Sequence, residues 1–229
     1  MRVTFVTNNT GLLIAFEGID GTGKTTIAKI LKEKFDAFGF ETVIFKEPTN
    51  ETNAGKKIRA SYNKNRVSLE EELQWFIEDR EWDVDHNIIP ALEANKLVLL
   101  DRYYFSTACY QGARKEGDWQ SILDINRAKF PEPDLTIIID LHPEIALERI
   151  TKSRKKSNSF EGLDYLTAVH ELFLQIYNLD KIGNFLLIDG TKSIEEIALI
   201  ISEEIVELID EKIQKRKTIS DSIDDDYDF

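Results

Sequence analysis

The chain has 229 residues, of which 42% are hydrophobic and 31% charged, a composition typical of a globular protein with one α/β domain or at most two small ones. No apolar run reaches the roughly eighteen residues of a membrane-spanning helix, and the first residues lack the apolar core of a secretory signal, so we expect a cytoplasmic protein that binds no membrane. The net charge of −13 argues against binding to nucleic acid, and the single cysteine excludes an internal disulfide.

Short apolar runs and helical patterns alternate along the chain. The predicted strands are Leu12–Phe16, Thr42–Phe45, Leu97–Leu100, Thr136–Leu141 and Leu186–Ile188. Helical spacing of apolar residues predicts helices at about 27–35, 69–88, 106–110, 119–129, 143–151, 163–182 and 194–212. Ser68 should cap the second helix, and Pro90 should end or kink it. The alternation predicts a three-layer α/β/α fold around a five-stranded parallel sheet.

Three stretches fall outside this pattern. Residues 1–11 precede the first strand as an N-terminal extension. Basic and polar residues at about 152–160 separate two helical patterns and predict a short mobile lid. Residues 214–229 carry a basic triplet followed by aspartates with no core pattern, and they predict an acidic, disordered tail. One folded domain would then span residues 12–213.

A phosphate-binding loop is the strongest motif. Residues 18–25 match the pattern G-x-x-x-x-G-K-[ST], and they lie between a predicted strand and a predicted helix, where the helix N-terminus favours an anion. Lys24 would reach the β- and γ-phosphates of a bound nucleotide, and Thr25 would bind Mg²⁺. The loop alone does not distinguish a GTPase, an ATPase motor and a small-molecule kinase. The base-reading Asn-Lys-x-Asp of a GTPase does not occur in the sequence. The expected ATP-binding residues are Gly18, Ile19, Asp20, Gly21, Thr22, Gly23, Lys24, Thr25 and Thr26.

Two further pairs suggest how a second ligand is bound. Asp101 and Arg102 follow the third strand and should face the phosphate loop, because ligands bind beyond the carboxyl ends of parallel strands. Asp101 would hold Mg²⁺ through a water and Arg102 would grip a phosphate, although an ion pair that closes the strand is the alternative. Phe76 and Arg80 are four residues apart on a helix, so an aromatic ring would lie beside the hydrogen-bond donors of a guanidinium, an arrangement that suits a flat base. The alternative is that Phe76 is an ordinary core residue and Arg80 a solvated surface residue.

These motifs together resemble the thymidylate kinase family. The resemblance rests on residues 16–26, Lys46-Glu47-Pro48, Asp79-Arg80, the segment 101–112 and residues 133–135, and it extends from Leu12 to about Asp189. It implies a P-loop nucleoside monophosphate kinase fold, transfer of the γ-phosphate of ATP to dTMP with Mg²⁺, and a homodimer. The substrate-binding residues that the resemblance and the spacing support are Asp20, Lys46, Arg59, Phe76, Arg80, Arg102, Ser106, Thr107, Tyr110 and Gln111.

Catalysis is expected to depend on Lys24, Arg102 and an arginine of the lid. The phosphate loop has Gly21 where related kinases can carry that arginine, so the resemblance leaves Arg154 as the best donor and Arg149 as the second. The chain departs from the family at Lys46, where an arginine is usual, and a lysine offers a point charge in place of a fork. The alternatives are a kinase of other or broader specificity, such as for dUMP or UMP, and an ATP-dependent switch without catalysis.

Overall fold

The computed structural model of the chain describes residues 11–61, 67–115, 117–153, 162–180 and 183–224. Nearly all of the expected N-terminal extension and most of the expected lid, including Arg154, lie outside these residues. Within them, no helix combines the length and the apolar character needed to cross a membrane.

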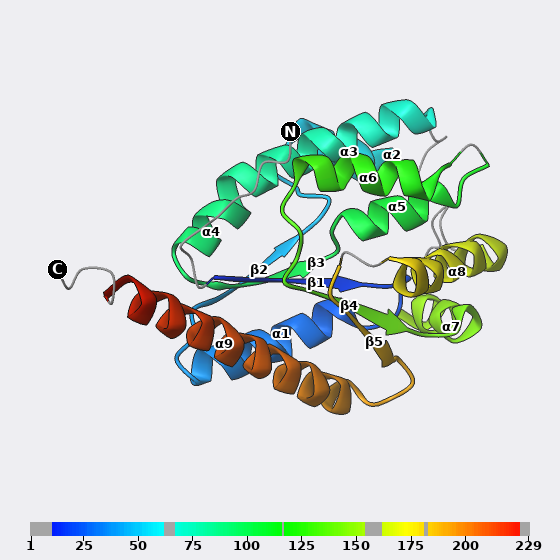
Figure 1. Ribbon diagram of the computed structural model, residues 1–229. Coiled ribbons are helices and arrows are strands. Elements are labelled where there is room, and N and C mark those ends of the chain that lie inside the picture. Colours follow the sequence, from blue (N-terminus) through cyan, green and yellow to red (C-terminus); the bar gives the residue numbers. More distant parts are fainter. Residues whose placement is uncertain (1–10, 62–66, 116, 154–161, 181–182, 225–229) are drawn as a thin grey trace.

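Among the described residues, five parallel strands form one sheet in the spatial order β2-β3-β1-β4-β5 (Figure 1). The strands are β1 Leu12–Glu17, β2 Thr42–Lys46, β3 Leu97–Asp101, β4 Leu135–Asp140 and β5 Phe185–Asp189. Each predicted strand is confirmed to within one residue at either end. Every residue of β1 and β3 is buried, which explains why these strands are apolar throughout.

Helices cover both faces of this sheet, with α1 and α9 on one face and α4, α5, α6 and α8 on the other (Figure 1). Leu12 and Ile14 of β1 pack in the core with α1 and α9, whereas Leu13 and Ala15 pack in the core with α5 and α8. The predicted three-layer α/β/α fold is therefore confirmed. The helices are α1 Lys24–Ala37, α2 Asn53–Ser61, α3 Leu69–Asp83, the π-helical turn η1 Val84–Ile88, α4 Ile89–Glu93, α5 Tyr104–Gly112, α6 Trp119–Lys129, α7 Pro143–Ser153, α8 Leu163–Leu179 and α9 Ile194–Asp224.

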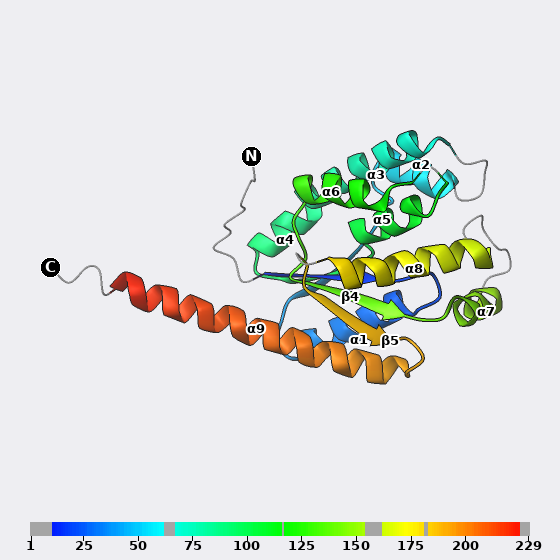
Figure 2. The ribbon, with the colours of Figure 1, turned by 45° about the vertical axis from the view of Figure 1, so that its right-hand side comes forward.

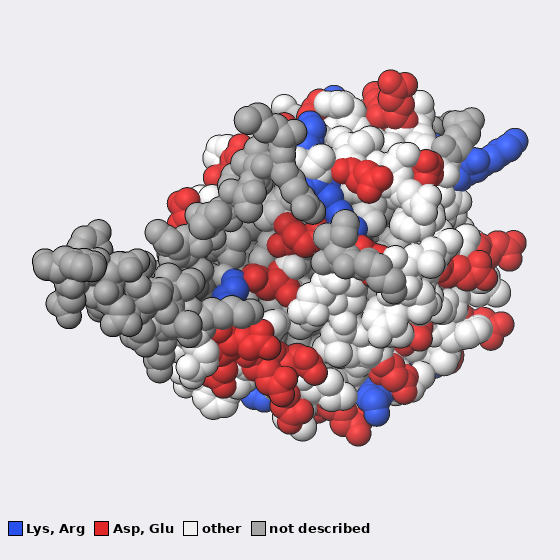
Figure 3. Space-filling view, in the orientation of Figure 1, with Lys and Arg blue, Asp and Glu red and all other residues white. Residues whose placement is uncertain are grey.

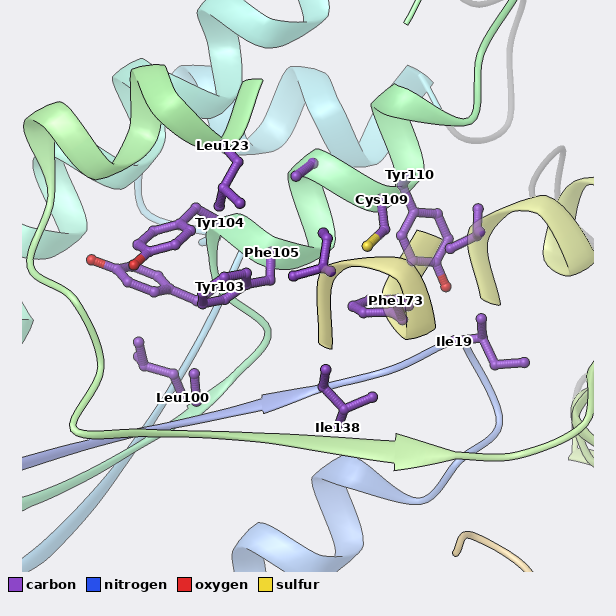
Figure 4. Packing of buried hydrophobic residues seen from close by; sticks show 14 of the residues in the cluster. Ile19, Leu100, Tyr103, Tyr104, Phe105, Cys109, Tyr110, Leu123, Ile138 and Phe173 are labelled. Atoms are coloured by element: carbon purple, nitrogen blue, oxygen red, sulfur yellow. The ribbon is translucent and has the colours of Figure 1, made fainter. Parts of the chain in front are cut away.

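The core beneath α5 and α8 is rich in aromatic side chains. Tyr103, Tyr104 and Phe105 lie close to Leu100 of β3 in Figure 4, and Phe173 of α8 lies above the sheet. Their rings are fully buried or nearly so. This packing fixes the start of α5 against the end of β3, the region from which the candidate site is built.

The helix predicted from Leu69 towards Pro90 does not run unbroken. It is regular to Asp83 and then widens into η1, where the N–H of Ile89 donates to the carbonyl of Val84, five residues back. Proline has no N–H, and in a regular helix its ring crowds the carbonyl four residues before it. The wider turn lets the chain continue into α4 despite Pro90. The predicted cap is confirmed, since the Ser68 side chain accepts from the N–H of Glu71.

Two other helices differ from expectation. Helix α2 was not predicted, because only Ala54 and Ile58 of its apolar residues face the core and nine residues give too short a pattern. Helix α9 continues to Asp224, so the expectation of a disordered tail from residue 214 is wrong for residues 214–224; these contain neither glycine nor proline to stop a helix. The far end of α9 extends past the body of the molecule in Figure 2.

Candidate active site

The phosphate loop connects β1 to α1 and is built on glycine. Gly18 and Gly21 have φ angles of 124° and 86°, and a Cβ atom at either would lie 2.7 Å from a backbone oxygen, that of Ile139 or Ala146 respectively. No other residue fits these positions. The loop therefore presents backbone N–H groups at the start of α1, as an anion site requires.

Lys24 is folded over this loop. Its ammonium donates to the carbonyls of Gly18 (3.0 Å) and Ile19 (2.7 Å) and to the Thr22 hydroxyl (3.2 Å), and its side chain is 5% exposed. Burial and the nearby guanidinium of Arg102 lower the pKa of Lys24 to about 7. A bound polyphosphate would add negative charge beside this ammonium and favour its charged form.

Thr25, Asp101 and Lys46 form a cluster at the carboxyl ends of the strands. The Thr25 hydroxyl and the Lys46 ammonium both donate to Asp101 Oδ2, and Lys46 also donates to Thr25 Oγ1 at 3.3 Å. Asp101 is 1% exposed, and in the part of the chain that the structure describes its Oδ1 has no hydrogen-bond partner. Burial alone would raise the pKa of Asp101, but the ammonium groups of Lys46 and then Lys24 outweigh it and hold the pKa below its ordinary value.

This cluster fits a magnesium site. Mg²⁺ prefers hard oxygen ligands and is usually held by one or two of them together with waters and nucleotide phosphates. The Thr25 hydroxyl and the carboxylate of Asp101, with its unpartnered oxygen, supply such ligands. Both residues were predicted for this role.

A pocket of about 280 Å³ opens beside the phosphate loop. All ten residues predicted to bind the acceptor line it, so the structure brings together side chains from the phosphate loop and from β2, α2, α3 and α5. Sequence reasoning did not assign the three other lining residues to the site: Glu47, Pro48 and Tyr103. The first two stand in the Lys46-Glu47-Pro48 motif, which was the available signal.

Arg102 bridges the loop and the pocket. One terminal nitrogen donates to the Gly18 carbonyl (3.1 Å) and the Ser106 hydroxyl (2.8 Å), and the other to Asp20 (2.8 Å) and the Tyr110 hydroxyl (3.3 Å). Its φ of 77° lies in the left-handed region, which costs a residue with a side chain roughly 1 kcal/mol or more. Strain of this kind persists where the surrounding contacts fix the residue.

Helix α5 supplies Ser106 to Gln111 and is anchored by Glu17 of β1. The buried Glu17 carboxylate accepts from the N–H groups of Tyr103 (2.9 Å) and Ser106 (3.2 Å), the unpaired donors at the start of the helix. Burial raises the pKa of Glu17 above its ordinary value, although the Ser106 hydroxyl and Arg102 oppose the shift. The end of β1 thus positions both the phosphate loop and the first turn of α5.

Arg80 is buried at the base of the pocket. Its guanidinium donates to Glu47 Oε2 (2.8 Å from Nε), Asn126 Oδ1 (2.6 Å) and the Thr107 hydroxyl (3.0 Å), and the side chain is 1% exposed. The alternative that Arg80 is a surface residue is therefore wrong. Burial raises the pKa of the Glu47 carboxyl, while Arg80 acts against the rise.

Several polar atoms of the pocket lack partners. Five buried side-chain oxygens of the described residues have no hydrogen-bond partner, and three of them belong to residues that line this pocket: Glu47 Oε1, Tyr103 Oη and Gln111 Oε1. Buried polar groups are rarely left unpaired without a functional reason. Phe76, 8% exposed, adds an aromatic ring to the same pocket.

Arg59 and Arg149 lie on helices close to the loop and pocket. Arg59 of α2 donates to the carbonyls of Pro48 and Thr49, and the preceding turn is held by the buried Asp79, which accepts from the Thr49 N–H at 2.6 Å. Arg149 of α7 donates to the Gly190 carbonyl at 3.2 Å, and Gly21 lies against the same helix. Arg154, the first choice for the lid arginine, lies outside the described residues.

Acidic side chains are widespread on the face shown in Figure 3, and basic ones form only small groups. On this face, favourable charge for an anionic ligand is confined to these small basic groups.

A family model for thymidylate kinase matches residues 16–201. The chain belongs to the thymidylate kinase family. A "Probable thymidylate kinase" of Archaeoglobus fulgidus is 44% identical over 206 residues, which are 90% of this chain and 98% of the relative. Thymidylate kinases of Leptospira borgpetersenii (40%; 81% of this chain and 89% of the relative) and Desulfotalea psychrophila (42%; 73% and 83%) are also similar. The expected family is confirmed, and residues 1–11 and 214–229 lie outside the matched range.

Proposed function

We propose that this protein is a thymidylate kinase, which transfers the γ-phosphate of ATP to dTMP and yields dTDP and ADP. The observation that carries the proposal is the pocket beside the phosphate loop, since it gathers all ten residues expected to bind the acceptor. The pocket is lined by the cationic side chains of Lys46, Arg59 and Arg102, by the buried Arg80 and by the aromatic ring of Phe76. A nucleoside monophosphate has the matching chemistry, a phosphate joined to a flat base.

The hydrogen-bond partners of Arg80 and Arg59 support the view that these two arginines bind different parts of the acceptor. Arg80 is held inside the core by Glu47, Asn126 and Thr107, and a buried guanidinium held in this way suits the edge of an uncharged base beside Phe76. Arg59 donates to backbone carbonyls, which leave its positive charge uncompensated, and this suits a phosphate. We therefore assign the base to the Arg80 region and the acceptor phosphate to Arg59, Arg102 and Lys46.

In this arrangement catalysis is positioning and charge stabilisation. The loop and Lys24 hold the phosphates of ATP, and Arg102 contacts both the loop and the pocket, between donor and acceptor. The acceptor phosphate is already an anion, so no strong general base is required. Held by Thr25 and Asp101, Mg²⁺ would neutralise charge on the transferred group.

The family resemblance supports three further proposals. The protein forms a homodimer in the cytoplasm, residues 152–160 act as a lid over the nucleotides, and Arg154 stabilises the transferring phosphoryl group when the lid closes. Sedimentation of the purified protein tests the first, and the arginine variants described below test the last.

An ADP-release assay with ATP, Mg²⁺ and one nucleoside monophosphate at a time tests the function. We expect kcat/KM for dTMP to exceed that for dUMP by at least about tenfold, because one methyl group in a fitted pocket gives discrimination of that order. Equal rates with dUMP or UMP would indicate a kinase of broader range. Binding of ATP without ADP release for any monophosphate would indicate a switch.

A further inference from the structure

Lys46 lies between the candidate Mg²⁺ site and the pocket proposed for the acceptor. Its ammonium is bonded to Asp101 Oδ2 and, at 3.3 Å, to Thr25 Oγ1, the two residues that fit Mg²⁺. Yet Lys46 also lines the acceptor pocket, together with Arg59 and Arg102. The same ammonium therefore stands at the border between the metal site and the acceptor site.

The backbone explains this position. Lys46 is the last residue of β2 and pairs in register with Asp101, the last residue of β3. Because the strands are parallel, both side chains emerge at the carboxyl edge of the sheet. The Lys46 side chain is 47% exposed, whereas that of Asp101 is 2% exposed, so the lysine can change its rotamer while the carboxylate is fixed.

Lys46 and a divalent cation cannot both use Asp101 favourably. Like charges at one carboxylate repel: Mg²⁺ at the unpartnered Oδ1 would lie beside the ammonium on Oδ2, and it would also need the Thr25 hydroxyl that Lys46 now contacts. Once Asp101 is taken, the ammonium needs another anion, and the pocket that it lines is where we place the acceptor phosphate. An arginine at this position would pair with Asp101 through a planar fork, whereas a lysine is a single, freely rotating point charge.

We propose that Lys46 couples the two sites: it caps Asp101 in the absence of metal and moves to the acceptor phosphate when Mg²⁺ binds with the donor nucleotide. The inference rests on the proposed function, since it takes dTMP as the acceptor. Its consequence is positive cooperativity between Mg²⁺·nucleotide and dTMP, and linkage makes the effect reciprocal. In this role Lys46 is a positioning residue: it frees Asp101 for Mg²⁺ and at the same time brings a positive charge to the acceptor phosphate.

Calorimetric titration of dTMP into the full-length protein tests this without catalysis. Three conditions are compared: protein alone, protein with the β,γ-imido analogue of ATP in EDTA, and protein with the same analogue and Mg²⁺. For the parent protein we expect the dTMP dissociation constant to fall at least about fivefold on adding the analogue with Mg²⁺, and less than about twofold with the analogue in EDTA.

Three variants identify the residue responsible. In Lys46→Met the Mg²⁺-dependent gain should shrink to below about twofold. In Arg59→Met dTMP should bind more weakly in every condition, but the gain should stay at the parent's value, because Arg59 does not contact Asp101. Lys56→Met is the matched control: an exposed lysine of α2 bonded to the Glu51 carbonyl, whose loss should change neither affinity nor gain.

The outcomes separate the inference from the function on which it rests. Three results would overturn the coupling while leaving dTMP binding intact. The Mg²⁺-dependent gain in dTMP affinity could be as large in Lys46→Met as in the parent, it could be absent from the parent, or it could be lost in Arg59→Met as well. If the parent binds no dTMP in any condition, the proposed function fails and the coupling fails with it. Circular dichroism of Lys46→Met checks that the fold is kept, as its exposed position predicts.

Discussion

Replacing Arg80 with methionine should destabilise the protein by about 3–5 kcal/mol at pH 9, because it removes one partner of a buried pair. Arg80 and Glu47 are 1% and 3% exposed, and the guanidinium bonds to Asn126 and Thr107 as well. Methionine fills much of the space but leaves the Glu47 carboxyl without its cation. For a chain of 229 residues this loss corresponds to a fall of roughly 6–20 °C in melting temperature.

The pH dependence follows from the direction of the Glu47 pKa. Burial already raises that pKa above its ordinary value of 4.5, and loss of Arg80 raises it further. A carboxyl whose pKa is higher in the folded state binds more protons there, so its stabilising contribution is complete below about pH 4.5 and is lost as pH rises through the folded pKa. Because the Glu47 pKa is already about 8 in the parent, parent and Arg80→Met should lose this contribution alike up to about pH 7, and the gap between them should widen as pH rises through about 8.

Thermal melts of five proteins test this reasoning: the parent, Arg80→Met, Glu47→Gln, the double variant and Lys152→Met. Lys152→Met, which breaks the exposed pair with Glu148, should leave the melting temperature within about 2 °C of the parent's. The double variant Glu47→Gln with Arg80→Met should recover about half of the loss, since no buried carboxyl remains unpaired. A fall in Arg80→Met no larger than that in Lys152→Met, or a double variant that is the sum of the two singles, would refute the reasoning.

Three other predictions concern catalysis and the chain end. Lys24→Ala should abolish transfer with the fold intact, because the ammonium that bridges the loop to the phosphates is lost; turnover within about tenfold of the parent's would contradict the assignment. Arg154→Ala should lower kcat at least about a hundredfold with little change in ATP affinity, and Arg149→Ala measured beside it shows which arginine serves the transition state. Removing residues 214–229 should leave the melting temperature and kcat nearly unchanged, since Ile205 is the last buried residue among those of α9 whose side chains are described; a marked fall would show that the segment docks.

The sheet could be predicted closely and the helices less so. Strands buried on both faces are continuous apolar runs, and such a run fixes both its own bounds and its place at the centre of the sheet. Helix α2 buries only two apolar side chains, those of Ala54 and Ile58, too few for a helical pattern to be seen. In α9 the last apolar side chains described as packing against the core are the partly buried Leu208 and Ile209, so the sequence pattern did not show that the helix continues to Asp224. The π-turn before Pro90 depends on how the backbone relaxes around a missing donor, which residue types alone do not determine.

The membership of the acceptor pocket was predictable, but its charge distribution was not. The spacing of Phe76 and Arg80 already suggested that Arg80 serves a base, but the sequence does not show which groups surround Arg59 and Arg80. The fold supplies them: Glu47, 33 positions from Arg80, emerges after β2 and bonds to it inside the core, while Arg59 meets only backbone carbonyls among its described partners. The partners that tertiary packing gives an arginine decide how much of its charge is left for a ligand, so this part of the chemistry had to come from the structure.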